Sequence, residues 1–225
     1  MKEEIKLEPS EELAYWTGVI QTDGSLKYSK KFRYWRISLY VSSKSLEMLR
    51  EIQELTPKLI KRQSRIWKDK KEDMFYWHIG VSRLLKLKIF EKSDIKFGDP
   101  PKPPIWCTKT DKLFGAYLAG LIDGDGSVFI VKRYGDAGYD CRTQITSGSA
   151  QIELKSMLEK ILGCSVRVWK CHPIIWQKGY HLDFLISSKT IEFIQKYVLP
   201  WIQISRKRQV IEKFVGIRGW SRPEI

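Results

Sequence analysis

Two aspartates in equivalent local contexts are the strongest chemical signal in the sequence. Asp23 and Asp125 each follow an apolar, helix-forming segment, and each is followed by Gly. A helix C-terminus carries partial negative charge and disfavours an acid, so this placement costs stability unless a cation relieves it. Carboxylate oxygens with open water positions suit Mg²⁺. One Asp-Gly pair is typical of a simple turn, but two at matched positions in a basic chain favour a metal site.

The two aspartates belong to an internal repeat. Segments 14–25 (AYWTGVIQTDGS) and 116–127 (AYLAGLIDGDGS) align without gaps at an offset of 102 residues, which grows to 105 by Ser82 and Ser187. A slowly growing offset indicates a duplicated fold with small loop insertions. The proline-rich stretch 99–104 predicts a stiff, extended connector between the halves. We therefore expect two domains, residues 1–102 and 103–225.

Both halves show the same order of periodicities. Ser10 is a suitable N-cap for the helix that ends near Asp23, and Gly24 is expected to serve as a left-handed C-cap. Residues 36–42 alternate strictly between apolar and polar, which predicts a half-buried strand. Second helices are predicted over 46–59 and 154–161, and strand pairs over 64–68 with 75–82 and 165–170 with 180–187. The predicted fold class is α+β, with two α-β-β-α-β-β-α repeats built on antiparallel sheets.

Small residues on the duplicated helix predict how the halves meet. Ala14 and Gly18, like Ala116 and Gly120, stand one turn apart. This spacing lets two helix backbones approach closely. We expect the two helices to pack on each other, so that the aspartates at their ends come together.

The side chains on the open face of each sheet should indicate what kind of molecule the protein binds. Helices that all cover one face of a sheet leave the other face to solvent. The side chains expected there are almost wholly basic or neutral, whereas a merely solvated face would carry as many acids as bases. Such side chains can reach base edges and phosphates. The candidates are Ser29, Arg33, Arg36, Ser38, Tyr40 and Lys68 in the first half, and Lys132, Arg133, Arg142, Gln144, Arg167 and Lys170 in the second.

Composition limits the possible partners. The chain has 40 Lys and Arg against 26 Asp and Glu, a formal charge of +14, so a polyanion is expected. No run of 18 apolar residues and no signal peptide is found, which predicts an intracellular protein without membrane contact, cytoplasmic or nucleoid-associated, with an organellar origin left open. The cysteines and histidines lack zinc or redox spacing. A Cys164–Cys171 disulfide is left open.

Residues 118–126, LAGLIDGDG, resemble the LAGLIDADG motif with one change, and residues 16–24 resemble a degenerate copy. The chain is thus similar to the two-repeat monomeric homing endonucleases of the LAGLIDADG family. The resemblance implies sheets that form a DNA-binding saddle, with the motif helices packed at the interface. It implies that Asp23 and Asp125 bind catalytic metals and that the carbonyls of Thr22 and Gly124 lie nearby. Gln21 replaces an acid that the second copy keeps as Asp123, which affects hydrogen bonding at the helix end more than catalysis.

The implied activity is hydrolysis of both strands of a long, asymmetric double-stranded DNA site by one chain without an obligate protein partner. Mg²⁺ is the expected cofactor, Mn²⁺ is expected to substitute, and Ca²⁺ is expected to support binding without cleavage. The family also places a basic residue after a proline to orient water. Lys109, Arg206 and Lys207 are the candidates here, and each is equally compatible with an ordinary phosphate contact.

Two other functions remain open on the same scaffold. One is an intron RNA maturase, and the other is a DNA-binding regulator without cleavage activity. Both would tolerate loss of the acids, so the presence of both aspartates favours the endonuclease. An intron-borne or free-standing reading frame is the expected genetic context.

Overall fold

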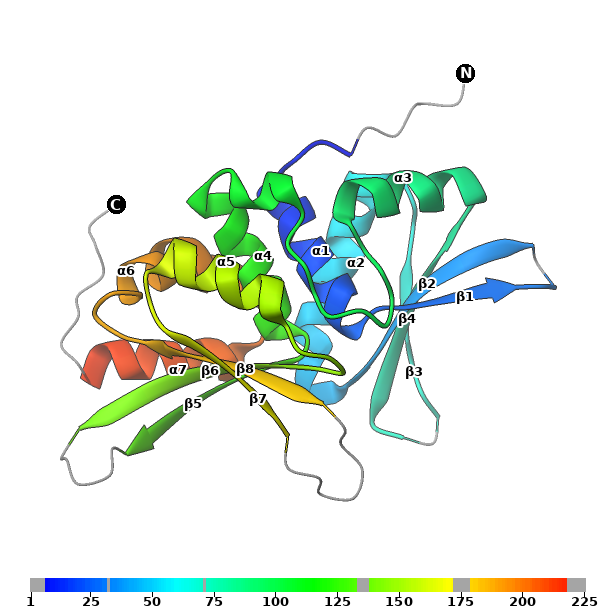
Figure 1. Ribbon diagram of the computed structural model, residues 1–225. Coiled ribbons are helices and arrows are strands. Elements are labelled where there is room, and N and C mark those ends of the chain that lie inside the picture. Colours follow the sequence, from blue (N-terminus) through cyan, green and yellow to red (C-terminus); the bar gives the residue numbers. More distant parts are fainter. Residues whose placement is uncertain (1–6, 32, 71, 133–137, 172–178, 218–225) are drawn as a thin grey trace.

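The protein consists of two α+β repeats that lie side by side, as Figure 1 shows. The computed structural model describes residues 7–31, 33–70, 72–132, 138–171 and 179–217. The first repeat contains α1 (Glu11–Asp23), β1 (Ser25–Ser29), β2 (Tyr34–Ser42), α2 (Leu46–Ile60), β3 (Arg65–Lys68), β4 (Met74–Val81) and α3 (Arg83–Ser93). The second contains α4 (Asp111–Asp123), β5 (Gly126–Lys132), β6 (Tyr139–Ser147), α5 (Ile152–Leu162), β7 (Val166–Lys170), β8 (Tyr180–Ile186), α6 (Ile191–Phe193) and α7 (Ser205–Ile217).

Each repeat carries one four-stranded antiparallel sheet. The strand orders are β1-β2-β4-β3 and β5-β6-β8-β7, so the two sheets have the same topology. Most helices lie above the sheets in Figure 1, and no helix among the described residues covers the lower face of either sheet. The predicted fold class is confirmed. The boundary at residue 102 stays a prediction, and it falls in the segment that links α3 to α4.

Alternation along the strands separates a buried face from an open one. In β2, the side chains of Ile37, Leu39 and Val41 are buried, whereas Tyr40 between them is 46% exposed. This pattern follows from the two-residue period of a strand with one face on a core. The first helix begins as predicted, because the Ser10 side chain accepts a hydrogen bond from the Leu13 N–H at 3.2 Å.

Three expectations from the sequence need revision or completion. Gly24 is not left-handed: its φ of −73° and ψ of 147° are extended, because the chain passes directly from α1 into β1. The second repeat gains α7, which packs against β5 and β6 and was not predicted. All four cysteines are free thiols, so Cys164 and Cys171 are not bridged. Among the described residues, no helix combines the length and apolar character needed to cross a bilayer.

The two repeats are joined by direct backbone contact between α1 and α4, which lie at the centre of Figure 1. A Cβ atom added to Gly18 would overlap the backbone oxygen of Tyr117, and one added to Gly120 would overlap the oxygen of Tyr15. The predicted helix pairing is therefore confirmed. Both helices are buried along most of their length, in one apolar core that extends across both repeats.

We expect Gly18→Ala to lower the free energy of unfolding by about 3 kcal/mol, because the added methyl forces α1 away from rigid backbone atoms of α4. Urea denaturation measures the change. Gly216→Ala, in α7, is the matched control, since its Cβ meets no atom within 4 Å. It should leave the protein unchanged or stabilise it by up to about 1 kcal/mol, because alanine favours the helix. Equal effects from the two substitutions would contradict the tight helix packing.

Candidate active site and nucleic-acid interface

The C-terminal ends of α1 and α4 touch. A Cβ atom on Gly124 would overlap the Thr22 side chain, so the residues just before Asp23 and Asp125 are in contact. Burial and then the Asp125 charge raise the pKa of Asp23 to about 7, while Lys207 opposes this shift. Burial likewise raises the pKa of Asp125. The structure therefore brings the two predicted metal-binding aspartates together in a partly dry site.

The open faces of the sheets carry most of the predicted contact residues. Cross-strand pairing places seven of them there: Ser29, Arg36, Ser38, Tyr40, Arg142, Gln144 and Arg167. Ser38 lies on this side but is only 4% exposed, and its hydroxyl is 3.0 Å from that of Ser25. It is therefore the least accessible of the seven.

Three predicted contact residues lie on the opposite face. Lys68, Lys132 and Lys170 each end a strand and pair with Phe75, Tyr139 and Tyr180, whose strand positions belong to the helix-covered side. A shift of one residue moves a side chain to the other face, and the sequence did not reveal where each strand ended. Arg33 lies in the turn between β1 and β2 with a φ of 52°, and Arg133 lies outside the described residues.

An acid on the second sheet was missed. Asp183 is 8% exposed, lies on the open face opposite Gln144, and forms an ion pair with Arg142 at 3.6 Å. Burial raises the pKa of Asp183, while Arg142 and then Arg167 lower it. Its alternation with Leu182 and Phe184 in the sequence could have revealed it. The Arg142 side chain is therefore already paired with Asp183 in the free protein.

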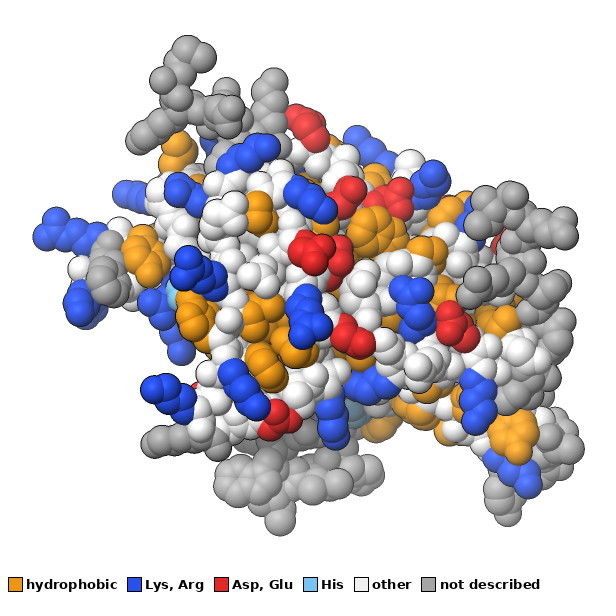
Figure 2. Space-filling view, turned by 180° about the vertical axis from the view of Figure 1, so that it is seen from behind, with side chains coloured by type: hydrophobic (Ala, Val, Ile, Leu, Met, Phe, Trp, Pro, Cys, Tyr) orange, Lys and Arg blue, Asp and Glu red, His pale blue; other side chains and the backbone are white. Residues whose placement is uncertain are grey.

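Aromatic residues on the first sheet were also missed, apart from Tyr40. Trp67, Tyr76 and His78 share the open face with Tyr40, and Trp67 is 42% exposed. Lys and Arg side chains, blue in Figure 2, are spread over the rear of the molecule, with red acidic side chains near the centre.

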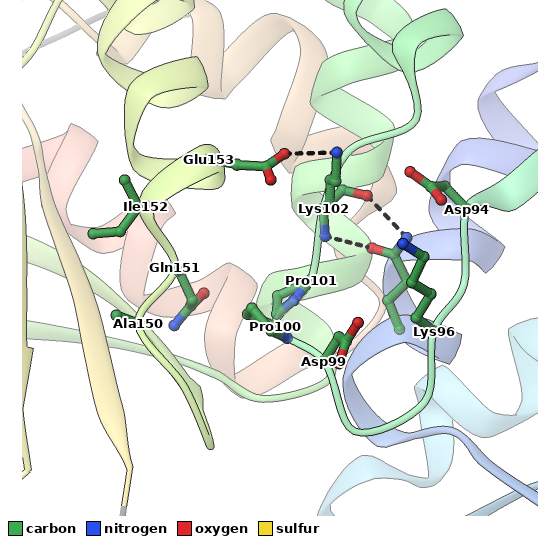
Figure 3. Close-up of a pocket in the computed structure, with 11 residues that line it drawn as sticks. Asp94, Lys96, Asp99, Pro100, Pro101, Lys102, Ala150, Gln151, Ile152 and Glu153 are labelled. Carbon is green, nitrogen blue, oxygen red and sulfur yellow. Dashed lines mark hydrogen bonds and ion pairs between the residues drawn. The ribbon is translucent and has the colours of Figure 1, made fainter.

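A pocket of about 240 Å³ lies beside the linker between the repeats, and Gln21 of α1 is among the residues that line it. Figure 3 shows that one wall comes from the linker and the other from the start of α5. The Lys102 ammonium spans the two walls, at 2.8 Å from the carboxylate of Glu153. The pocket is therefore part of the junction between the repeats.

Known proteins share both the sequence pattern and the fold described above. Residues 10–96 match the family of LAGLIDADG-like domains. The chain thus contains a LAGLIDADG-like domain that spans its first repeat. No curated protein sequence matches it, so the relationship beyond the first repeat rests on fold and on the second motif copy.

The two-repeat LAGLIDADG fold recurs in solved structures of low sequence identity. The homing endonuclease I-DmoI, in a study of its mesophilic variants, aligns with a TM-score of 0.56 and 16% identity, over 84% of this chain and 95% of that one. I-LtrWI bound to target DNA aligns with a TM-score of 0.58 and 16% identity, over 93% and 92%. Full-length DUF199/WhiA from Thermatoga maritima aligns at 0.55 and 18%, over 94% of this chain and 62% of that one.

Each LAGLIDADG helix is anchored near its end by the residue two positions before the aspartate. Asp123 accepts hydrogen bonds from the Tyr15 hydroxyl at 2.9 Å and from the Gln203 N–H at 2.7 Å. Gln21 accepts equivalent bonds from the Tyr117 hydroxyl at 2.6 Å and from the Lys102 N–H at 3.2 Å. The neutral amide therefore keeps the contacts of the missing acid.

Lys207 caps the end of α4 from the side. Its side chain is 2% exposed, and its ammonium donates to the carbonyls of Ile122 at 2.5 Å, Asp123 at 2.9 Å and Gly124 at 3.4 Å. Burial lowers the pKa of Lys207 to about 8, against the opposing pull of Asp123. A cation at this place offsets the negative end of the helix. Its contacts with these carbonyls position the end of α4, and its charge also interacts with Asp23 and Asp125, so its role in orienting water stays a prediction.

The end of α1 has no equivalent lysine. Gln203 and Lys102 occupy equivalent positions, because their N–H groups donate to Asp123 and Gln21. Lys207 follows Gln203 by four residues. The residue four after Lys102 is Trp106, whose indole N–H donates to the Lys92 carbonyl at 2.6 Å. Lys109 lies before the start of α4, about 20 Å from its other end along a 13-residue helix. The structure therefore does not bring Lys109 to the aspartate pair.

Arg206 is exposed beside Ser205, and Ser205 bonds Glu47 of the first repeat through its N–H at 2.7 Å. The Arg206 charge also contributes to lowering the pKa of Lys207. Arg206 is thus the predicted basic residue that stays accessible near the paired helix ends.

The site suits a divalent cation. Two neighbouring carboxylates with raised pKa values, at two negative helix ends, are stabilised by added positive charge. Within the described part of the chain, no group of three or more Asp, Glu, His and Cys side chains is arranged around a metal position. The carboxylates of Asp23 and Asp125, with the carbonyls of Thr22 and Gly124, stay the predicted oxygen ligands, and the Gly124 carbonyl also accepts from Lys207 at 3.4 Å. Water and a substrate phosphate would complete the coordination, as is usual for Mg²⁺.

We expect Asp23→Asn to stabilise the metal-free protein increasingly as pH rises from 4 to 7. The folded wild type holds the Asp23 proton between the ordinary pKa of 3.8 and about 7. Its stability therefore falls as pH rises through that window, and the asparagine variant avoids the loss. The difference should approach zero below pH 4 and reach on the order of 1–3 kcal/mol at pH 7.5. Denaturation in EDTA measures it, and a pH-independent difference would contradict the buried charge.

Proposed function

We propose that this LAGLIDADG protein is a homing endonuclease that hydrolyses both strands of a long, asymmetric DNA site with divalent metal ions. The observation that carries the proposal is the meeting of Asp23 and Asp125 at two touching helix ends, between the open faces of two sheets. Folding alone disfavours this arrangement, so a ligand with positive charge accounts for it best.

Charge and fold support duplex DNA as the substrate. The net charge of +14 suits a polyanion, and Arg36, Arg142, Gln144 and Arg167 lie on the open faces. I-LtrWI is known bound to target DNA, and I-DmoI in complex with DNA and Mn and in complex with DNA and Ca. We propose the same partner for this chain, with Mg²⁺ as the working metal and Mn²⁺ as a substitute.

The residues of the chain have separate tasks in the proposed reaction. The sheets would hold the duplex with its scissile phosphates over the helix ends, where Asp23 and Asp125 would hold the metal ions. Metal ions at such sites activate a water and stabilise charge on the phosphate and the leaving oxygen. Lys207 fixes the end of α4, and so positions Asp125, through its three carbonyl contacts. Arg206 is available to contact phosphate.

Asp23→Asn and Asp125→Asn should each reduce double-strand cleavage in Mg²⁺ by at least about 1000-fold, because each removes charge that binds metal. Specific binding should stay within about threefold of the wild type, since the contacts lie on the sheets. Duplexes selected from a randomised library in Ca²⁺, where binding without cleavage is expected, supply the substrate. Gel analysis of both labelled strands then measures cleavage.

Asp111→Asn is the matched control for the cleavage experiment. Asp111 lies in the first turn of the same helix, at the end remote from the site, so cleavage should persist. Specific binding without cleavage by the wild type would identify a DNA-binding regulator instead. Selection that recovers structured RNA but no duplex sequence would indicate a maturase. Full cleavage by Asp125→Asn would remove the helix ends from the active site.

One chain should bind one duplex. Because the two sheets come from the same chain, they should cover two unlike half-sites, each about one helical turn long. Analytical ultracentrifugation of the protein with a selected duplex gives the stoichiometry. Two chains per duplex would contradict the single-chain saddle, even if cleavage depends on both aspartates.

A further inference from the structure

The open face of the first sheet carries three aromatic side chains in a row across adjacent strands. Tyr40 of β2 is opposite Tyr76 of β4, which is opposite Trp67 of β3. The ring centroids are 6.4 Å apart for Tyr40 and Tyr76 and 6.2 Å apart for Tyr76 and Trp67. We call these three residues the aromatic row. They form one continuous aromatic surface about three strands wide.

The ends of the aromatic row are exposed and held in place. Tyr40 is 46% exposed and Trp67 is 42% exposed. The Tyr40 hydroxyl donates to Glu72 at 3.1 Å, with Asp69 at 3.4 Å as a second possible acceptor, and the indole of Trp67 stacks on His78 at 4.7 Å with an interplanar angle of 11°. Both rings are thus preorganised, and their remaining surface faces solvent.

Two arginines on the strands flank one side of the aromatic row. Two positions along the strands from the row, Arg65 of β3 lies opposite His78, and Arg36 lies a further two positions along β2. The acids Asp69 and Glu72 lie on the other side, after β3. A nucleic-acid backbone would therefore pass over the side with the arginines, with its bases directed toward the row.

The second sheet lacks this surface. Its equivalent row is Thr146 of β6, His181 of β8 and Trp169 of β7. The Thr146 hydroxyl and the His181 Nδ1 are 3.1 Å apart, so these two side chains form a polar pair. Only the tryptophan is shared, within the matching strand sequences RIWK and RVWK. The two repeats therefore present different chemistry at the same place.

The aromatic row fits unpaired bases better than a duplex. A duplex shows a protein the edges of its bases, which offer hydrogen-bond donors and acceptors and, at thymine, one methyl group. The flat faces of the bases are hidden in the stack. Unpaired bases expose those faces and stack on aromatic side chains, as on the sheets of single-strand-binding domains. An exposed aromatic surface beside arginines has the chemistry that such bases require.

We propose that the aromatic row is a stacking platform that binds unpaired bases of single-stranded nucleic acid. This binding uses neither Asp23 nor Asp125, and so stands apart from the proposed cleavage. It assigns the first sheet a ligand of its own, which the second sheet binds less well. Stacking tolerates any base sequence, so the binding should show little sequence preference.

The test measures binding of the full chain to fluorescein-labelled (dT)15 and (rU)15 by anisotropy in EDTA. The wild type should bind, and Trp67→Ala should weaken binding roughly 5- to 100-fold, the usual loss of one stacked base. The double variant Tyr40→Thr with Tyr76→His gives the first row the composition of the second and should weaken binding to a similar degree. The rings lie on the surface, so unfolding temperatures should stay near that of the wild type.

The second repeat supplies matched controls. Trp169→Ala should change the affinity less than about twofold, and Thr146→Tyr with His181→Tyr should strengthen it. A preference for (rU)15 over (dT)15 would identify the ligand as RNA, and the reverse preference as DNA. Asp125→Asn should bind single strands like the wild type, which separates this result from any failure of the proposed cleavage.

Two outcomes would overturn the stacking platform. In one, the wild type does not bind the single strands, or the row variants leave that affinity unchanged. In the other, the row variants weaken binding of a 20-base-pair duplex by the same factor as binding of single strands. The aromatic row would then be an ordinary groove contact of the duplex interface.

Discussion

The direct backbone contact between α1 and α4 is the constraint on which the rest of the molecule depends. Gly18 and Gly120 leave no room for a side chain, so each helix rests on backbone atoms of the other. This contact joins two similar repeats into one core and fixes the relation of their sheets. It also brings Asp23 and Asp125 to the same place. Any larger residue at the contact would separate the repeats and the carboxylates together, so the fold and the candidate active site share one determinant.

Bringing two helix ends together concentrates negative charge, and the chain relieves it unequally. The buried Lys207 offsets the end of α4 through three carbonyl contacts, whereas the corresponding position near α1 holds Trp106. Asp23 has its pKa raised to about 7. A carboxylate with a pKa raised in this way favours a bound cation, because the positive charge offsets both the cost of desolvating the carboxylate and the repulsion from Asp125. The instability of the metal-free site is therefore directly related to its capacity to bind metal.

The sequence predicted what depends on local periodicity and missed what depends on register. Strict alternation correctly assigned Arg36, Tyr40 and Arg142 to the open faces, because one buried face constrains every second residue. Lys68, Lys132 and Lys170 were assigned to the wrong face of the sheet. Each lies at the end of a strand, and alternation does not reveal where a strand ends. The Arg142–Asp183 ion pair depends on how β6 aligns with β8, and the sequence of either strand alone does not predict that alignment. A basic residue after Pro200 was expected, but the direction of the Lys207 side chain depends on how α7 packs against β5.

Duplication explains why the two sheets can differ without loss of stability. Their backbones have the same strand order, and the buried positions between them carry the core, so side chains on the open face contribute little to folding. Replacement of a tyrosine by threonine at such a position changes what the sheet can bind far more than it changes the free energy of unfolding. The contrast between Tyr40 and Tyr76 on one sheet and Thr146 and His181 on the other is therefore best explained by their ligands. Exposed aromatic surface is unfavourable in water, so the wider aromatic surface on the first sheet points to a partner that covers it.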